Sequence, residues 1–364
     1  MTTTAPRITA PRGLRARLMS LAAQLSTPLL PADYLDVIDP LLSGAHLRGR
    51  IVAIHPETRD SVTLVIRPGR GWAGHVPGQY VRVGVDIDGV RQWRAYSLTS
   101  RTSVPGGLFS ITVKAIPGGV VSNHLVRRAT PGTLVHLDQA AGDFILGDPA
   151  PARLLFVTAG SGITPVMGML RNLAPTDPAD IVVVHSAPTA ADVIFGGELR
   201  MLAADGRIRL VEIHTDTDGM LDALGLAELV GDLAERHTWA CGPAGLLDAL
   251  ERYWAAAGIA EKLHKERFRP PLLATGDGGT VTFTATGITV EDGDGQSLLD
   301  AGEGAGVLMP SGCRMGICFG CVAPLRRGAV RDLRTGELTT ANDGDGIVIQ
   351  TCISAAAGDC DIDL

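Results

Sequence analysis

The fold of the C-terminal part of this chain is decided by one stretch, PSGCRMGICFGC, residues 310–321. Four residues separate Cys313 from Cys318, two separate Cys318 from Cys321, and Cys352 follows well downstream. Three thiolates on one short loop can surround a small iron–sulfur cluster, and a fourth from a distant segment completes its second iron. Glycines alternate with these cysteines, so backbone N–H groups can approach the sulfur atoms. The spacing therefore predicts a [2Fe-2S] cluster ligated by Cys313, Cys318, Cys321 and Cys352.

Two other uses of these cysteines fit less well. Zinc sites usually combine two short C-x2-C units, and this pattern holds only one. Disulfides are disfavoured in a cytosolic protein, and we expect a cytoplasmic protein because the N-terminus lacks the apolar core and cleavage site of a signal peptide. Cys360 lies outside the spacing and is expected to be an ordinary thiol.

The residues around the cysteines carry a resemblance. The runs SLLDAG (297–302) and PSGCRMGIC (310–318) resemble plant-type ferredoxin domains, and the similarity covers nearly all of residues 280–364. It implies a β-grasp fold for a C-terminal [2Fe-2S] ferredoxin domain.

The whole chain has 364 residues, which is too many for one core, so we expect a multidomain protein. Short alternating runs predict an antiparallel β-barrel over 46–148. Buried strands alternating with helical stretches predict a parallel α/β domain over 151–265. Prolines and glycines predict a linker over 266–279.

Residues 1–45 are predicted to form an N-terminal helical extension, because leucines recur at helical spacing between Leu14 and Leu25. We expect this helix to pack on the neighbouring domain. A helix that binds a membrane surface or a partner is the alternative.

The barrel holds a candidate flavin site. Arg94-Ala95-Tyr96-Ser97 ends a predicted strand and combines a guanidinium for a phosphate, a ring for stacking and a hydroxyl for a ring nitrogen. The glycines at 118 and 119 precede a short helix predicted over 123–128, whose N-terminus can hold a pyrophosphate. A plain glycine turn capped by Ser122 is the structural alternative.

Together these two segments resemble the flavin domain of the ferredoxin–NADP reductase superfamily. The resemblance implies that the Arg and Ser positions hold the flavin phosphates and that Tyr96 packs on the isoalloxazine. We expect FAD as the cofactor, with FMN as the alternative that the sequence leaves open. The implied binding residues are Arg94, Tyr96, Ser97, Gly119, Val121 and Ser122.

A candidate nicotinamide site follows the strand predicted over 154–158. The turn Ala159-Gly160-Ser161-Gly162-Ile163-Thr164-Pro165 precedes a helix, an arrangement that places phosphates at the helix N-terminus. Pro165 replaces the third glycine of the dinucleotide fingerprint. The segment at 185–192 offers hydroxyls but no arginine and no acid at the strand end, so it leaves NADH and NADPH open.

The same superfamily has a G-x-G-x-T-P turn and, after a later strand, a C-G-P turn. The resemblance implies that Cys241 lies beside the reacting nicotinamide, and that Tyr96, Ser97 and Cys241 take part in catalysis. Glu266-Arg267-Phe268 resembles a glutamate-x-phenylalanine segment that approaches the flavin. The implied further cofactor-binding residues are Gly160, Gly162, Thr164, Pro165, Cys241, Gly242, Pro243 and Phe268.

The order of domains implies an enzyme, an NAD(P)H oxidoreductase that passes electrons from NAD(P)H through FAD and [2Fe-2S] to an iron-dependent oxygenase or desaturase. Residues 27–35 resemble actinobacterial reductases that serve membrane fatty-acyl desaturases, which would bring the protein to the inner face of the membrane. A soluble Rieske oxygenase or a cytochrome P450 is an alternative acceptor. A non-enzymatic redox sensor is a further alternative.

Charge is uneven along the chain. The net charge is −7, and residues 278–364 alone, with five arginines and twelve acidic residues, sum to the same −7. This distribution argues against a nucleic-acid partner and favours docking on a basic protein surface, although an acidic domain that is merely soluble fits as well.

Overall fold

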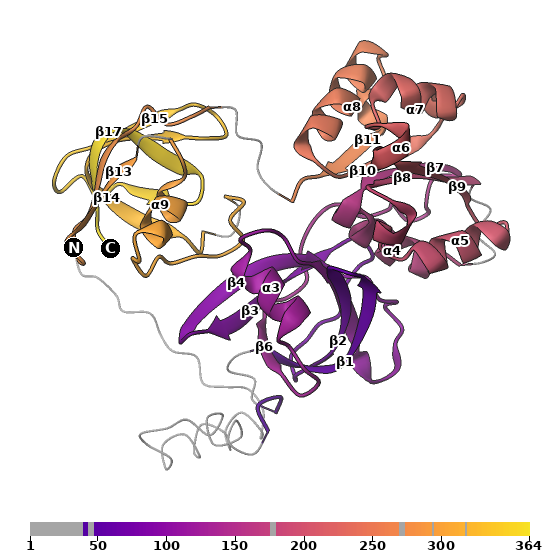
Figure 1. Ribbon diagram of the computed structural model, residues 1–364, viewed down its shortest axis with the longest axis horizontal. Coiled ribbons are helices and arrows are strands. Elements are labelled where there is room, and N and C mark those ends of the chain that lie inside the picture. The colour runs from indigo at the N-terminus through magenta and orange to yellow at the C-terminus, as the bar shows by residue number, and fades with distance from the viewer. Residues whose placement is uncertain (1–38, 43–46, 175–179, 269–273, 293–294, 317–318) are drawn as a thin grey trace, which may run out of the picture.

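The computed structural model describes residues 39–42, 47–174, 180–268, 274–292, 295–316 and 319–364. It contains an antiparallel sheet, a parallel sheet with helices and a C-terminal mixed sheet, which confirms the predicted fold class (Figure 1). The helical extension predicted over 1–45 lies outside the described residues except for 39–42, and Cys318 also lies outside them.

The barrel is one antiparallel sheet in the order β4-β3-β6-β1-β2-β5. Its elements are β1 (Arg48–Thr58), β2 (Ser61–Pro68), β3 (Tyr80–Ile87), β4 (Val90–Ser97), β5 (Phe109–Lys114), β6 (Leu134–Leu137) and the helix α3 (Val120–Arg127). Asp88 and Gly89 join β3 to β4 with φ values of 51° and 80°, the backbone that a two-residue hairpin turn needs. This hairpin sets the register that places Ser97 opposite Tyr80.

The helix α3 begins at Val120, three residues before the predicted start at Asn123. Gly119 is its N-cap residue, so Ser122 lies inside the first turn rather than capping it. The Ser122 hydroxyl donates to the carbonyl of Gly119 and accepts from the N–H of Ile116. The serine thus stabilises the glycine turn from within the helix.

The α/β domain has a parallel sheet in the order β11-β10-β7-β8-β9. Its strands are β7 (Arg153–Ala159), β8 (Asp180–Ala187), β9 (Arg209–His214), β10 (His237–Cys241) and β11 (Leu263–Glu266). Its α-helices are α4 (Ile163–Asn172), α5 (Gly196–Ala204), α6 (Thr215–Asp218), α7 (Ala223–Leu229) and α8 (Ala244–Ala256). One core lies between the sheet and α4 with α5, and a second lies between the other face and α7 with α8. Both faces of the sheet are covered, which explains the continuous apolar runs of β7 and β8.

The C-terminal domain has a mixed sheet in the order β13-β12-β17-β14-β15, with β16 beside β14. Its elements are β12 (Gly279–Phe283), β13 (Ile288–Asp292), α9 (Leu298–Gly304), β14 (Val322–Asp332), β15 (Leu338–Ala341), β16 (Val348–Gln350) and β17 (Ser354–Ile362). The terminal strands β12 and β17 are parallel neighbours, and α9 packs on the sheet, as a β-grasp fold requires. Ser297 caps α9 by accepting from the N–H of Asp300 at 3.1 Å.

The described ends of the segment predicted as a linker, 266–268 and 274–279, lie against neighbouring elements. Glu266 is the last residue of β11, so the α/β sheet includes it. At the other end, the N–H of Ala274 donates to the Leu333 carbonyl and the N–H of Asp277 to the Ala356 carbonyl. Gly279, with φ 140°, allows a backbone approach in which a Cβ would lie 2.4 Å from Gly358. Glycines of the predicted linker thus lie against β17.

The barrel and the α/β domain are joined through α4. A Cβ on Gly168 would lie 2.3 Å from the Leu98 carbonyl oxygen, so helix and barrel backbone are in contact. Arg171 donates to the Thr99 carbonyl at 2.7 Å, and Asn172 donates to the Ser100 carbonyl at 3.0 Å. In the described ranges, no helix is both long and apolar enough to cross a bilayer.

Candidate active site at the junction of three domains

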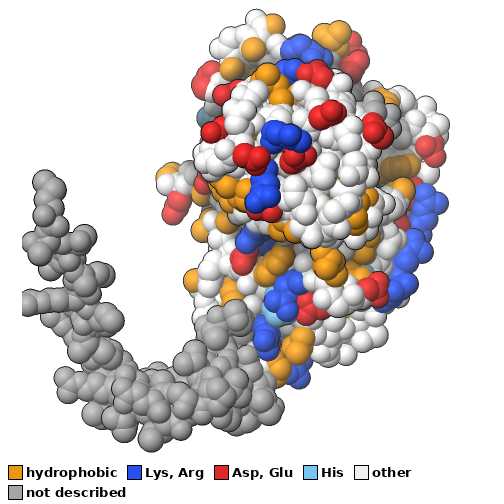
Figure 2. Space-filling view, turned by 90° about the vertical axis from the view of Figure 1, so that its left-hand side faces the viewer, with side chains coloured by type: hydrophobic (Ala, Val, Ile, Leu, Met, Phe, Trp, Pro, Cys, Tyr) orange, Lys and Arg blue, Asp and Glu red, His pale blue; other side chains and the backbone are white. Residues whose placement is uncertain are grey.

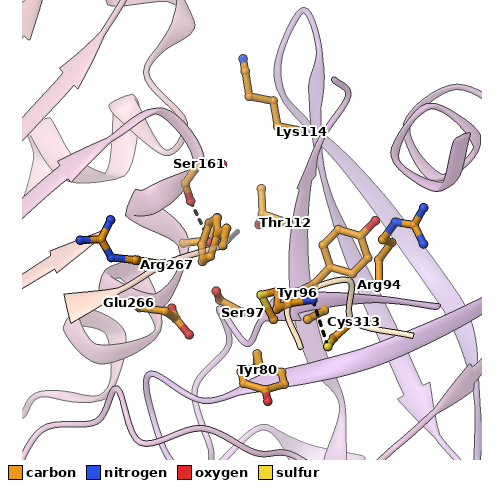
Figure 3. A pocket seen from close by; sticks show the side chains of 14 residues that line it. Tyr80, Arg94, Tyr96, Ser97, Thr112, Lys114, Ser161, Glu266, Arg267 and Cys313 are labelled. Atoms are coloured by element: carbon orange, nitrogen blue, oxygen red, sulfur yellow. Dashed lines mark hydrogen bonds between the residues drawn. The ribbon is translucent and has the colours of Figure 1, made fainter. Parts of the chain in front are cut away.

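A cavity of about 160 Å³ lies where the three domains meet. Figure 3 shows Arg94, Tyr96 and Cys313 at one end and Ser161, Glu266 and Arg267 at the other. The barrel, the α/β domain and the cluster loop each provide part of its wall. The lining residues are Tyr80, Arg94, Ala95, Tyr96, Ser97, Thr112, Lys114, Ser161, Thr164, Glu266, Arg267, Phe268, Cys313 and Met315.

The barrel wall is formed by the end of β4. Arg94 donates to the Trp93 carbonyl at 2.7 Å, and no ion pair found among the described residues includes its guanidinium. Burial first, and the charge of Arg314 second, lower the pKa of Arg94 to about 10. Burial also raises the pKa of Tyr96, so its phenol stays protonated. The Ser97 hydroxyl is buried and has no hydrogen-bond partner within the described ranges.

These groups fit a flavin nucleotide. A buried guanidinium without a carboxylate partner suits a phosphate, and an unpaired hydroxyl suits a polar ring atom. Burying either group without a partner costs free energy, and a bound ligand that pairs with the group removes this cost. Arg94, Tyr96 and Ser97 are therefore brought together as the sequence predicted.

The residues predicted on α3 do not line this cavity. Val121 and Ser122 are buried against the barrel, and Gly119 ends the turn that precedes them. The helix instead borders a second hollow formed with the β3–β4 turn, lined by Ile87, Asp88, Val120, Asn123, His124, Arg127 and Arg128. The structure thus places the two predicted halves of the flavin site at different hollows, and the flavin-binding roles of Gly119, Val121 and Ser122 remain predictions.

The opposite wall comes from the turn after β7. Ser161 and Thr164 line the cavity, and the Thr164 hydroxyl donates to the Ser161 carbonyl at 2.9 Å. Gly160 has a φ of 53°, a conformation that favours glycine. Pro165 is buried in the first turn of α4. The predicted nicotinamide turn therefore reaches the cavity through Ser161 and Thr164.

The predicted C-G-P turn lies directly behind this wall. Cys241 ends β10 and is fully buried, and burial together with Glu266 raises the pKa of its thiol. Gly242 follows in contact with Ala159, where a Cβ would lie 3.3 Å from the alanine Cβ. Pro243 is the N-cap residue of α8. The thiol is therefore protonated and close behind the site, not among the cavity-lining residues.

Glu266 is a lining residue whose importance the sequence only suggested. It pairs with Cys241 in the parallel register of β10 and β11, and its Oε2 atom is buried without a hydrogen-bond partner in the part of the chain described. Burial raises the pKa of Glu266 to about 8. Such a carboxyl is protonated at neutral pH and can donate a hydrogen bond. Phe268 follows it, 39% exposed, at the edge of the same cavity.

The cluster loop provides the third wall. Cys313, Cys321 and Cys352 are buried, and the sulfur atoms of Cys321 and Cys352 lie 3.2 Å apart. Their hydrogen bond lowers the pKa of Cys321 to about 6 and raises that of Cys352. The N–H of Met315 donates to the Cys313 sulfur at 3.3 Å.

Buried thiols that meet without a disulfide, with a backbone N–H directed at one sulfur, suit an iron–sulfur cluster. No arrangement of three or more His, Cys, Asp or Glu side chains ready to hold a metal ion occurs in the described ranges, which exclude the predicted ligand Cys318. Cys313 and Met315 also line the flavin-side cavity. A cluster held by these thiols would therefore lie at the edge of that cavity.

Comparisons with known proteins agree with this division. Residues 58–145 match the oxidoreductase FAD-binding domain, 156–252 the oxidoreductase NAD-binding domain, and 281–357 the 2Fe-2S iron-sulfur cluster binding domain. The FAD and [2Fe-2S] cofactors predicted from the sequence are thereby confirmed.

The chain is 50% identical over 353 residues to an NADPH oxidoreductase of Mycobacterium tuberculosis, covering 95% of this chain and 92% of the relative. It is 32% identical over 320 residues to a glycine betaine monooxygenase reductase subunit of Pseudomonas aeruginosa, covering 79% and 86%. A solved phthalate dioxygenase reductase shares the fold, with a TM-score of 0.61 at 22% identity over 88% of this chain and 98% of that one.

Proposed function

Since this chain belongs to the family of ferredoxin–NADP reductase-like oxidoreductases that join FAD-, NAD- and 2Fe-2S-binding domains, we propose that it is the reductase component of an iron-dependent oxygenase or desaturase system. The chain is an NAD(P)H oxidoreductase of the ferredoxin-reductase type. The proposal adds the donor, NADPH, and the class of acceptor protein.

The observation that carries this function is the single cavity with walls from three domains. Arg94 and Tyr96 on one wall, Thr164 on the second and Cys313 on the third face a common space. Electron transfer between cofactors requires them to be close, and one shared cavity meets that requirement. A bound flavin accepts electrons from nicotinamide as a pair and an iron–sulfur cluster carries them singly.

In this proposal, the side chains of the cavity bind and orient the flavin and the nicotinamide. Arg94 would hold a flavin phosphate, Tyr96 would cover one face of the ring, and Ser97 would use its unpaired hydroxyl on a polar ring atom. Glu266, protonated at neutral pH, can donate a hydrogen bond at the nicotinamide end. Cys241 beneath it stays neutral, which avoids placing a negative charge where a hydride donor binds.

The donor is proposed to be NADPH. Asp192, the first acid after β8, accepts from Thr189 at 2.7 Å and pairs with Arg59 at 3.3 Å. It is therefore already engaged and is not free to bind the ribose diol that distinguishes NADH. The name of the M. tuberculosis relative at 50% identity supports the same choice.

The acceptor is proposed to dock on the ferredoxin domain. The five arginines of residues 278–364 all pair with acidic side chains, and acidic and basic groups are interspersed on the face shown in Figure 2. The remaining carboxylates keep the domain negative, which suits a basic acceptor surface.

The names of two relatives bear on the identity of the acceptor. They are a glycine betaine monooxygenase reductase subunit and the ferredoxin reductase component of 3-ketosteroid-9-alpha-monooxygenase, and both names include an oxygenase. The resemblance at residues 27–35 favours a membrane desaturase instead.

Turnover tests this function. NADPH should reduce ferricyanide and cytochrome c rapidly, and NADH should do so much more slowly. Negligible turnover with both donors would indicate a redox sensor instead.

Purification of tagged protein from native cells, followed by identification of the bound protein, should recover an iron enzyme. Reconstitution with that enzyme then separates a membrane desaturase from a soluble Rieske oxygenase or cytochrome P450.

A further inference from the structure

Arg59 reaches from the flavin barrel to the α/β domain. It lies in the turn between β1 and β2, where Thr58 pairs with Ser61 in the antiparallel register. Its Nε atom lies 3.3 Å from Asp192 Oδ1, so an ion pair joins the two domains. Asp192 belongs to the short turn that follows β8. The barrel therefore places a cation at the carboxyl end of the second strand of the parallel sheet.

The turn that carries Arg59 is held by polar side chains. Asp60, the next residue, accepts from the Lys114 ammonium with both carboxylate oxygens, each at 2.7 Å. The Asp60 Oδ1 atom also accepts from the Thr58 hydroxyl at 2.8 Å. These bonds fix the backbone from which the arginine side chain extends toward Asp192.

One carboxylate orients the guanidinium and leaves its terminal nitrogens open. The Asp192 side chain is only 7% exposed, and its Oδ2 atom accepts from the Thr189 hydroxyl at 2.7 Å. The Arg59 side chain is 80% exposed, and its contact with Asp192 is the one ion pair found for it among the described residues. Since that contact uses Nε, the two Nη groups of Arg59 can bind a further anion.

The position of this cation matches a feature of the nucleotide. In dinucleotide-binding sheets the residues after the second strand lie at the adenosine ribose, where a 2′-phosphate needs a cation. Residues 185–192 contain no arginine and no lysine. Arg200 donates to the Ala190 carbonyl at 3.3 Å, but Glu212 already occupies its guanidinium with two contacts of 2.8 Å. Arg59 offers free terminal nitrogens at the same segment.

We infer that Arg59 selects NADPH over NADH by binding the 2′-phosphate of the adenosine ribose with its terminal nitrogens. This role rests on the proposed choice of NADPH as the donor. A phosphate monoester carries a charge of about −1.5 to −2 at neutral pH and accepts charge-assisted hydrogen bonds from a guanidinium. NADH has a neutral hydroxyl at the same place, which gains little from the cation.

The ion pair with Asp192 serves the same selection. A carboxylate at the end of β8 would repel a phosphate, and Arg59 compensates that charge while it presents its remaining donors. Because the arginine belongs to the barrel, the residues that follow β8 in the sequence do not reveal the preference. The selecting side chain comes from about 130 residues earlier in the chain, through the packing of one domain on another.

Binding of nucleotide fragments to the full-length holoprotein tests this role without turnover. The ligands are adenosine 2′,5′-bisphosphate and adenosine 5′-monophosphate, titrated by isothermal calorimetry at one ionic strength. We expect Arg59→Gln to raise the Kd of the bisphosphate about tenfold or more and that of the monophosphate less than about twofold. Arg59→Lys keeps the charge without the fork of donors and should lie between wild type and Arg59→Gln. An equal loss for both ligands would overturn the inference.

Two control variants remove the same charge elsewhere. Arg153→Gln removes a cation that begins β7, at the opposite end of the sheet, and that pairs with Glu235. Arg200→Gln removes the occupied cation beside Ala190. Both should change the Kd of the bisphosphate by less than about twofold. A loss in either control as large as in Arg59→Gln would overturn the inference, because net charge or another arginine would then account for it.

Donor kinetics with ferricyanide separate failure of this role from failure of the proposed donor. In Arg59→Gln, kcat/KM for NADPH should fall about tenfold or more, through KM rather than kcat, and kcat/KM for NADH should not change. If wild type prefers NADPH and Arg59→Gln keeps that preference, only the role of Arg59 is wrong. If wild type prefers NADH and binds both nucleotide fragments equally, the proposed donor itself is wrong.

Discussion

Gly162 lies so close to Cys241 that a Cβ on the glycine would stand 2.0 Å from the cysteine carbonyl oxygen. The turn after β7 and the turn after β10 are therefore in backbone contact, with no room for any side chain between them. This contact fixes Ser161 and Thr164 in the wall of the cavity relative to the end of β10.

Gly162→Ala should disrupt this contact, because backbone on both sides cannot move away cheaply. We expect the KM for NADPH to rise about tenfold or more, with FAD content and cluster absorbance retained. Steady-state ferricyanide reduction checks this. Gly197→Ala, at a position in the same domain with open space around the glycine, should behave like wild type. An unchanged KM in Gly162→Ala would show that the turn does not position the nicotinamide.

Short motifs made much of this site predictable. Arg94, Tyr96 and Ser97 lie on one strand, and the cysteine spacing describes one loop, so local sequence is enough to group them. The resemblance of Glu266-Arg267-Phe268 suggested that this segment approaches the flavin, but neither the burial of the Glu266 carboxyl nor the place of Met315 in the cavity wall could be predicted in that way. Glu266 and Met315 enter the cavity through the parallel register of β10 with β11 and through docking of a separate domain, relationships that no sequence spacing encodes.

Glycine-rich segments were harder to interpret. The glycines before 123 predicted a helix start that lies three residues too late, because Gly119 itself serves as the N-cap. Those at 276–279 predicted a linker, and in the structure they also allow close packing on β17. Glycine marks unusual backbone geometry, and the sequence does not say whether that geometry serves flexibility or contact.

Arg94→Gln should weaken FAD binding, since the change removes a charge-assisted contact worth roughly 1.5–3 kcal/mol, or about ten- to a hundredfold in Kd. Flavin content after purification and fluorescence titration measure the effect. Arg91→Gln is the matched control: Arg91 lies on the same strand but is exposed and pairs with Asp86. Equal flavin affinity in the Arg94 and Arg91 variants would contradict the assignment.

Glu266 should make stability depend on pH. Its folded-state pKa, about 8, lies above the ordinary value of 4.5, so the folded protein binds a proton that the unfolded chain releases. Its favourable contribution is complete below about pH 4.5 and is lost as the pH rises through 8. Glu266→Gln removes this loss. Between pH 5 and 8.5, the free energy of unfolding of the variant should therefore rise relative to that of wild type by the order of a few kcal/mol.

Thermal unfolding of the FAD-loaded proteins at several pH values measures this gain. Glu251→Gln is the control, because its hydrogen bond to Lys265 lowers the pKa of Glu251 and places its titration below this pH range. Parallel pH profiles for wild type and Glu266→Gln would rule out a raised pKa at Glu266.

Cys321→Ser tests the cluster ligands against a matched buried thiol in the same core. Cys321 and Cys360 are each 2% exposed and both belong to the core of the ferredoxin domain, but only Cys321 lies beside Cys352. A serine hydroxyl is a poorer ligand for iron than a thiolate. Cys321→Ser should therefore lose most of the cluster absorbance and cytochrome c reduction, while ferricyanide reduction through the flavin persists. Cys360→Ser should keep all three, and a cluster that survives in Cys321→Ser at full occupancy would exclude Cys321 as a ligand.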